Sequence, residues 1–303
     1  MADTESFYEQ PLWKRLYAFL LAPLLVAAAA VGVFTAVSLL TNETTHPDEL
    51  VAAIKGGGEH RRWQSAFALT KYLQPSVQEA GTVLERESDA EYQAKLLQVR
   101  PLLPELLDVW NDPKRGTDEV RRYLALVFGY LGDSRSIEAL SGVMGVEDQE
   151  LVLNSLVALG MIGDRKATPA ALEGSRRDET GLRSTAAYVL GVLGGPAATD
   201  RLEVLVTDTS PSVRWNAAFG LARVGNAAGE EVILEILERG PIYQGESADP
   251  ARQREQFLNA VRSAGMLRSA RTMDKLRTIA QTDENLKARD MAKKLVAAKD
   301  SSL

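Results

Sequence analysis

The sequence predicts an all-α protein: a right-handed α-solenoid of about eight helix pairs, preceded by one transmembrane helix. Three observations indicate this fold class. Residues 16–40 form an uncharged apolar run, the residues that follow repeat at a step of 31, and the repeats carry apolar side chains at helical spacing. The chain has 303 residues, of which 45% are hydrophobic and 6% aromatic, so it is long enough to bury a large core.

The apolar run reads "LYAFLLAPLLVAAAAVGVFTAVSLL" and spans 25 residues. At about 1.5 Å per residue it makes a helix of roughly 37 Å, and a hydrocarbon core is about 30 Å thick. The apolar region of a cleavable signal peptide is normally only about 7–15 residues long. We therefore expect an uncleaved membrane anchor over residues 16–40.

The flanking charges predict how this anchor is oriented. Lys14 and Arg15 precede the run, and no further basic residue occurs until Lys55. The positive-inside rule then makes residues 1–15 a cytoplasmic tail and residues 41–303 an extracytoplasmic domain. In a bacterium this placement is the inner membrane, with the large domain in the periplasm.

One face of the expected anchor carries small residues four apart, namely Ala28, Gly32 and Ala36. Such spacing lets a second helix approach closely in lipid, so these residues are candidates for membrane-helix packing. The alternative is that alanine and glycine are simply common in such helices.

The remainder of the chain contains internal repeats. The segments "GYLGDSRS", "GMIGDRKA", "GVLGGPAA" and "ARVGNAAG" begin 31 residues apart, at Gly129, Gly160, Gly191 and Ala222. An earlier copy begins at Arg62, and a later one follows an insertion of 12 residues. One helix pair cannot bury its apolar face alone, so stacked pairs are expected to share a core.

Each repeat divides into two helical stretches. In the unit around Gly191, one stripe of a helix is apolar, and "GGP" then stops that helix before Pro196 opens the next. This pattern predicts second-helix starts near residues 60, 89, 118, 149, 180, 211, 252 and 285.

The blocks "SVRWNAAFGLARVGN" and "GLRSTAAYVLGVLGG" resemble HEAT-type repeats, of the short variety also found in phycobilin lyases. The shared pattern is Asp, then Val-Arg, paired alanines and spaced glycines, matched here by Asp208, Val213, Arg214, Ala217, Ala218 and Gly225, and by Asp178, Arg183, Ala186, Ala187, Gly191 and Gly194. The resemblance covers about residues 45–300 and implies a ladder of Arg–Asp contacts between repeats. Val152 and Arg268 depart from the pattern, so we expect the ladder to be interrupted.

Four arginines occupy matching repeat positions: Arg62, Arg121, Arg183 and Arg214. One interpretation is structural, with each guanidinium bridging to a carboxylate or carbonyl of a neighbouring turn. The other is a basic stripe along a ligand surface.

Glycines also recur at two repeat positions. A left-handed helix cap is expected at Gly132, Gly163, Gly194 and Gly225. The other glycine position, which includes Gly191, is expected to let neighbouring helices approach closely.

Motifs for chemistry are scarce. The chain has no cysteine and only two histidines, His46 and His60, which argues against a conventional zinc site. "KGGGEH" lacks the Lys-Ser/Thr ending of a phosphate-binding loop, and a net charge of −6 argues against nucleic-acid binding. We therefore expect no enzymatic activity and no cofactor.

The insertion "GPIYQGESADPAR" at 240–252 is a candidate protein-binding loop through Ile242, Tyr243 and Arg252, or else a tolerated surface insertion. The sequence as a whole favours a membrane-anchored scaffold or accessory subunit of a membrane complex, such as a transporter, secretion or respiratory assembly. Its expected partners are other membrane protein subunits. Two alternatives remain open: a chromophore lyase-like enzyme, which the family resemblance implies, and a periplasmic receptor for a peptide or small ligand.

Overall fold

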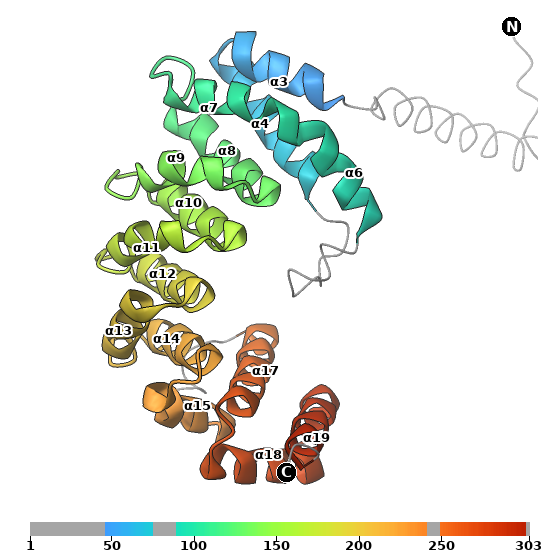
Figure 1. Ribbon diagram of the computed structural model, residues 1–303, viewed down its shortest axis with the longest axis vertical. Helices are drawn as coiled ribbons and strands as arrows, with labels where there is room; N and C mark the ends of the chain where they lie inside the picture. The colour runs from blue at the N-terminus through green and yellow to red at the C-terminus, as the bar shows by residue number, and fades with distance from the viewer. Residues whose placement is uncertain (1–45, 75–88, 241–248, 301–303) are drawn as a thin grey trace, which may run out of the picture. The chain divides into compact units, whose positions relative to one another are not determined.

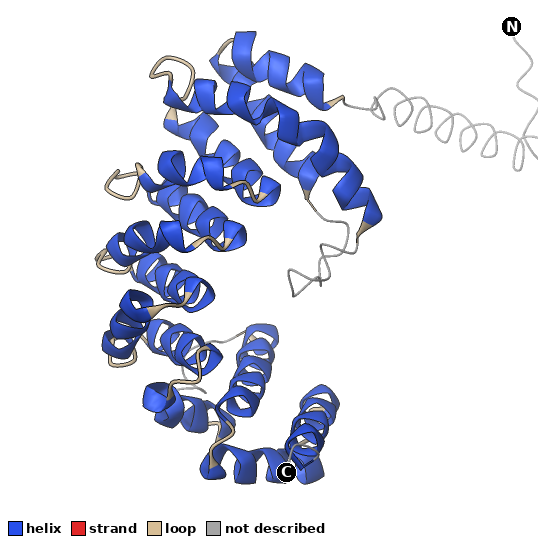
Figure 2. Cartoon of the chain, viewed as in Figure 1, coloured by secondary structure: helices blue, strands red, loops and turns tan. Residues whose placement is uncertain are grey.

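A computed structural model describes residues 46–74, 89–240 and 249–300, and these residues form helices and connecting turns without a β-strand (Figure 2). The chain divides into two compact units, Met1–Glu49 and Leu50–Leu303. The expected anchor at 16–40, with Ala28, Gly32 and Ala36, lies outside the described residues. Within the described ranges, no helix is both long and apolar enough to span a bilayer.

Seven helix pairs, and one further helix, are formed by the described residues (Figure 1). The pairs are α3 (Pro47–Gly56) with α4 (Glu59–Leu73), α7 (Leu103–Asn111) with α8 (Asp118–Leu131), α9 (Ile137–Ser141) with α10 (Gln149–Ile162), α11 (Thr168–Gly174) with α12 (Thr180–Leu193), α13 (Pro196–Leu205) with α14 (Pro211–Arg223), α15 (Glu230–Leu237) with α17 (Pro250–Leu267), and α18 (Ala270–Thr282) with α19 (Leu286–Asp300). Short 3₁₀ turns precede several first helices, at η3 (Ser134–Ser136), η4 (Arg165–Ala167) and η5 (Ala227–Gly229).

The predicted second-helix starts agree with these bounds to within two residues. The pair expected near residue 89 is the exception. The helix that begins there, α6 (Ala90–Val99), runs through the 3₁₀ turn η2 (Arg100–Leu102) directly into α7. It is therefore not the second member of a pair among the described residues.

The second helices stack side by side, α4 on α8, α8 on α10, α10 on α12 and α12 on α14. Glycine makes one of these approaches possible. A Cβ added to Gly191 on α12 would lie 2.5 Å from the Cα of Gly220 on α14. The two backbones are thus in contact where a side chain would otherwise separate them.

Helix boundaries follow from local residues. The Asp148 carboxylate accepts the Leu151 N–H at 2.9 Å and caps α10, and Pro211 opens α14 without leaving a backbone donor unpaired. The ends are set by glycine: Gly132 and Gly163, in the left-handed conformation with φ of 63° and 69°, terminate α8 and α10.

The buried apolar residues form two clusters. The first runs from Leu50 to Leu221, and the second runs from Trp215 to Ala292, so α14 contributes to both. Within the first cluster, Leu182, Ala186, Val189, Leu190 and Leu193 are all buried, as the predicted stripe requires.

The register break between α14 and α17 has two parts. The helix starts, at 211 and 250, are 39 residues apart, whereas the positive-φ residues at the helix ends, Gly225 and Arg268, are 43 apart. Part of the 12-residue insertion therefore precedes α17, and the rest lengthens that helix to 18 residues.

Candidate functional site

The recurring arginines occupy the fourth position of their helices, and each donates to backbone carbonyls. Arg62 Nη1 lies 3.3 Å from the carbonyl oxygen of Lys114, and Arg121 donates from Nε and Nη2 to the Trp110 oxygen at 3.0 and 2.8 Å. Arg214 Nη1 donates to the carbonyls of Asp208 and Thr209 at 2.8 and 3.1 Å. These contacts favour the structural interpretation over a basic stripe, because the guanidinium groups are directed at turns of the chain.

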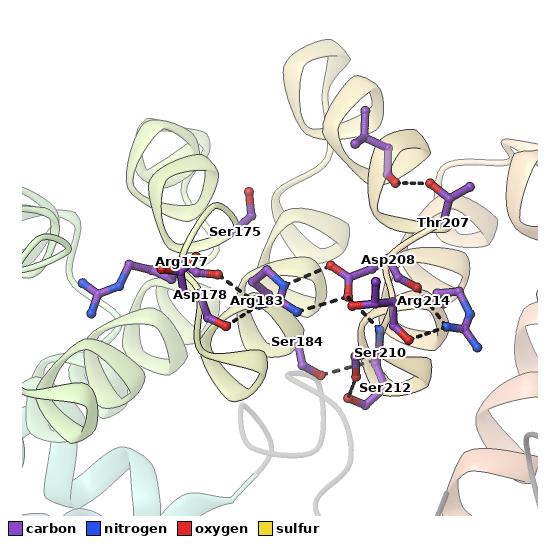
Figure 3. Close-up of polar contacts among 12 residues, drawn as sticks. Ser175, Arg177, Asp178, Arg183, Ser184, Thr207, Asp208, Ser210, Ser212 and Arg214 are labelled. Carbon is purple, nitrogen blue, oxygen red and sulfur yellow. Dashed lines mark hydrogen bonds and ion pairs between the residues drawn. The ribbon is translucent and has the colours of Figure 1, made fainter.

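Arg183 does the same and also joins two repeats (Figure 3). Its Nη1 donates to the carbonyls of Arg177 and Asp178 at 3.1 and 2.6 Å, and its Nε lies 3.0 Å from Asp208 Oδ2. Asp208 also accepts the Ser210 N–H at 2.8 Å. One arginine thus fastens the turn before its own helix to the turn before α14.

Opposing effects act on the Asp208 carboxylate. Burial alone would raise its pKa, but the hydrogen bonds from Arg183 and Ser210 and the charge of Arg183 outweigh this, so the pKa lies below its usual value. The charged form is therefore the one that the folded protein stabilises.

An equivalent contact two repeats earlier involves Arg122, one residue out of register with Arg121. Arg122 Nη2 lies 2.6 Å from Asp148 Oδ2, and its Nη1 lies 3.2 Å from Glu150 Oε2. As at Asp208, burial would raise the pKa of Asp148, but bonds from Arg122 and the Leu151 amide lower it overall. Sequence reasoning missed Arg122, because alignment by register selects Arg121; the adjacent arginine was the available signal.

Val152 stands where the Arg–Asp ladder is expected to be interrupted, and an arginine from a different position joins the turns there. Val152 is fully buried, and Arg177 from the following turn donates to the carbonyls of Met144 and Val146 at 2.9 and 3.1 Å. Arg177 also pairs with Glu179 at 3.0 Å. The turns at this step are therefore held by an arginine from outside the repeat position.

All four cap-position glycines have positive φ: 63° at Gly132, 69° at Gly163, 63° at Gly194 and 73° at Gly225. Arg268, which stands at the same position after α17, has a φ of 52°. Gly132, Gly163 and Arg268 are left-handed C-caps, and Gly225 follows the C-cap Val224. The left-handed cap expected at Gly194 is wrong, because its ψ is −165° and only Gly195 separates it from Pro196, where α13 begins.

The predicted binding loop is placed only in part. Ile242 and Tyr243 lie outside the described residues. Arg252 was expected in this loop, but it lies in the first turn of α17 and is exposed. The physical reason is a cap, since Asp249 accepts the Ala251 N–H at 2.9 Å and Pro250 starts the helix.

A row of large apolar side chains, which no motif had indicated, crosses the second helices. It occupies the ninth position of α4, α8, α10, α12 and α14: Phe67, Leu126, Val157, Tyr188 and Phe219. Tyr188 is 51% exposed, Phe67 41% and Val157 36%, whereas Phe219 is only 9% exposed. We call this row and its flanking exposed residues the second-helix face.

Hollows are also present elsewhere among the described residues. One, of about 580 Å³, is lined by residues that include Trp110, Arg121 and Glu138. The other, of about 550 Å³, is lined by residues that include Arg239, Phe257 and Asn285. Among the described residues, no three His, Cys, Asp or Glu side chains are grouped so that they could hold a metal ion.

The comparisons with known proteins concern the repeats. The segment 103–191 matches the family described as HEAT repeats. The all-helical fold resembles the CpcE–CpcF complex of phycocyanin lyase from Nostoc, with a TM-score of 0.52, 17% identity and coverage of 85% of this chain and 89% of that one. It also resembles the Escherichia coli protein YibA, with a TM-score of 0.50, 13% identity and coverage of 82% and 92%. At these identities the likeness is one of fold.

A curated relative is deoxyhypusine hydroxylase of Drosophila pseudoobscura pseudoobscura, 31% identical over 112 residues. The match covers 36% of this chain and 37% of the relative, so it spans little more than a third of either protein. The expectation that the chain is not an enzyme is contradicted by this match, because the relative is itself an enzyme. The motifs considered in the sequence, a zinc site and a phosphate-binding loop, belong to other folds. Their absence therefore does not exclude an enzyme built from HEAT repeats.

Proposed function

We propose that this chain is a HEAT-repeat scaffold that binds a partner protein on its second-helix face. The observation that carries the proposal is the apolar row. Monomeric proteins rarely leave large apolar side chains aligned on one surface, and aromatic residues are enriched where proteins bind one another. Here Phe67, Val157 and Tyr188 are each more than a third exposed and recur at one repeat position.

The face has the chemical character of a binding surface. Tyr123 and Met161, both half-buried, adjoin the row on α8 and α10, and the Trp63 ring stacks on Tyr123 at a centroid distance of 6.3 Å. Such rings offer a large contact area that is already held in place, so less side-chain entropy is lost on binding. The surface is therefore suited to receiving another apolar surface.

We also propose that the solenoid works next to a membrane, as an accessory subunit of a membrane complex. The support is the uncharged run at 16–40 and the basic residues Lys14 and Arg15 before it, which favour a periplasmic solenoid at the inner membrane. An anchor confines both partners to one surface and so raises their effective concentration. Ala28, Gly32 and Ala36 offer a face for packing against another membrane helix.

Purification of the full chain in mild detergent tests this function. We expect a stoichiometric second protein to remain bound and to be released by Tyr188→Glu. A chain that emerges alone and monomeric at every detergent concentration contradicts the stable-subunit proposal. Reporter fusions at the two termini test the topology, and a C-terminal fusion active only in the cytoplasm contradicts the periplasmic placement.

A second candidate is hydroxylation of deoxyhypusine, which the 31% identity to the Drosophila hydroxylase favours. It is tested by incubating the purified chain with deoxyhypusine, molecular oxygen as the oxidant and a two-electron reductant that reduces the second oxygen atom to water, and following the hydroxylated product by mass spectrometry. Product formation above that of heat-inactivated protein would support this candidate, and its absence under conditions in which a known deoxyhypusine hydroxylase is active would eliminate it.

A further inference from the structure

We propose that the occupant of the second-helix face is an amphipathic α-helix of the partner, lying across α4, α8, α10, α12 and α14 with acidic residues at its ends. This inference rests on the proposed function and adds the conformation and charge of the partner segment. Three features of the face support it. These are the spacing of the apolar row, the hydrogen bonds of the asparagine side chains beside the row, and the cations at the two ends of the row.

The spacing defines a step. Each stacked helix contributes one side chain to the row, as with Leu126 on α8, Val157 on α10 and Tyr188 on α12. Packed helices lie about 8–10 Å apart, so a partner must offer an apolar side chain about every 10 Å. Seven residues of an α-helix advance about 10.5 Å, and three residues of an extended chain advance about 10 Å. Spacing alone leaves both conformations open.

The backbone of the partner decides between them. An extended segment carries unpaired N–H and C=O groups that must find partners when they are buried, whereas a helix satisfies its own. The amide nitrogens beside the row already donate to groups within the solenoid. Asn154 Nδ2 donates to the Arg122 carbonyl at 3.1 Å, and Asn216 Nδ2 donates to the Ser184 carbonyl at 3.1 Å and to Ser184 Oγ at 2.9 Å. A helix needs nothing further from these groups, so it fits the face better.

The charges define the ends. Lys71 Nζ lies 5.6 Å from the Phe67 ring centroid, and the Arg223 guanidinium lies 5.9 Å from that of Tyr188. Among the described residues, neither cation has a carboxylate within ion-pair distance. Both stand at the thirteenth position of their helices, α4 and α14. Carboxylates on a bound helix would complete these two sites.

Two of the second helices carry a glutamate at the opposite edge of the face. Glu119 and Glu150 both occupy the second position of their helices, and Glu150 is paired with Arg122. Acidic residues of the partner would be repelled there. The charge pattern thus directs them toward the edge formed by Lys71 and Arg223.

Site-specific photocrosslinking tests the inference on the full chain in cells that produce it. A benzophenone amino acid is placed at Val157, at Tyr188 or at Val204, which is 58% exposed on α13 and serves as the off-face control. Crosslinked partner peptides are then sequenced by mass spectrometry. We expect Val157 and Tyr188 to capture one partner segment at sites about seven residues apart, and Val204 to capture none of it.

A charge test accompanies the mapping. Lys71→Glu combined with Arg223→Glu should lower the crosslink yield at Tyr188 about three- to ten-fold. Arg277→Glu, on the off-face helix α18, should leave the yield unchanged; circular dichroism confirms that each variant folds.

The possible results separate the two proposals. Crosslinks three residues apart would show an extended segment, and crosslinks insensitive to the double charge reversal would show that the ends are not acidic; either result overturns the inference and leaves the proposed function standing. Crosslink yields at Val157 and Tyr188 no higher than at Val204 would overturn both.

Discussion

Arg183 on α12 donates to Asp208, the residue two positions before the N-cap of α14, with Nε 3.0 Å from Oδ2. The side chains are 16% and 12% exposed, and the same guanidinium donates to two carbonyls of its own turn. One side chain therefore couples adjacent repeats. The stability of a solenoid is largely the sum of the stabilities of its repeats and of the interfaces between adjacent repeats. Contacts such as this one therefore hold adjacent repeats together.

Substitution of Arg183 by alanine should lower the free energy of unfolding by about 2 kcal/mol or more, because Asp208 and two carbonyls lose their donor in a poorly solvated place. Denaturant titration measures the change. Arg277→Ala is the matched control, since its pair with Asp274 is 48% and 75% exposed and should contribute less than about 1 kcal/mol. Equal effects at both positions would contradict the account of Arg183.

Acid should weaken the same link. The pKa of Asp208 is lowered in the folded state, so its contribution to stability is present above the unfolded pKa of about 3.9 and is lost as the pH falls through the folded value. The stability difference between the wild type and Asp208→Asn should therefore be greatest near neutral pH and shrink below about pH 4. A difference that grows on acidification would reverse the assigned sign.

Two glycines of α12 should respond oppositely to alanine. Gly191→Ala should destabilise the protein by about 2 kcal/mol, because the new Cβ would lie 2.5 Å from the Gly220 Cα. Gly181→Ala should be neutral or stabilise by up to about 1 kcal/mol, since nothing lies within 4 Å of the added atom. Thermal unfolding of both variants checks this, and a Gly191→Ala protein as stable as the wild type would disprove the close helix approach.

Ser155 is completely buried, and its hydroxyl has no hydrogen-bond partner. The corresponding residues of α12 and α14 are Ala186 and Ala217. Ser155→Ala should thus stabilise the fold by about 1 kcal/mol. Ser184→Ala is the counterpart and should destabilise, because the Ser184 hydroxyl donates to the Ser212 carbonyl at 3.3 Å and accepts from Asn216 at 2.9 Å.

The cap position offers a further pair of substitutions. Arg268 has a φ of 52° where other repeats have glycine, so Arg268→Gly should relieve backbone strain and stabilise by about 0.5–1 kcal/mol. Gly132→Ala should destabilise by about 1 kcal/mol through φ alone, since no atom lies within 4 Å of the added Cβ. Loss of stability in Arg268→Gly would mean that its side-chain contacts matter more than its conformation.

Much of the architecture could be predicted because the helix starts depend on local signals. Pro196, Pro211 and Asp148 act within one turn of their own position, so a single sequence is enough to place them. Contacts between repeats are less local. Arg122 reaches Asp148 from 26 residues away and lies outside the repeat register, so only the assembled stack reveals the pair.

The second-helix face was missed for a related reason. Tyr188 and Val157 each look like one more apolar residue of an amphipathic helix, and their exposure depends on how neighbouring helices cover them. Conversely, Arg252 lies in a helix and not in the expected loop, because α17 begins at Pro250 and includes the end of the insertion.

The most direct test of the central claim compares three full-length proteins in one detergent purification: wild type, Tyr188→Glu on the second-helix face, and Val204→Glu on α13. Val204 is 58% exposed and Tyr188 51%, so the two positions are matched in exposure. The amount of co-purifying partner is quantified per mole of solenoid. The account predicts equal recovery with wild type and Val204→Glu and loss of at least about nine-tenths of the partner with Tyr188→Glu, because the added carboxylate must be desolvated on binding. Undiminished recovery with a folded Tyr188→Glu protein would show that the partner binds elsewhere.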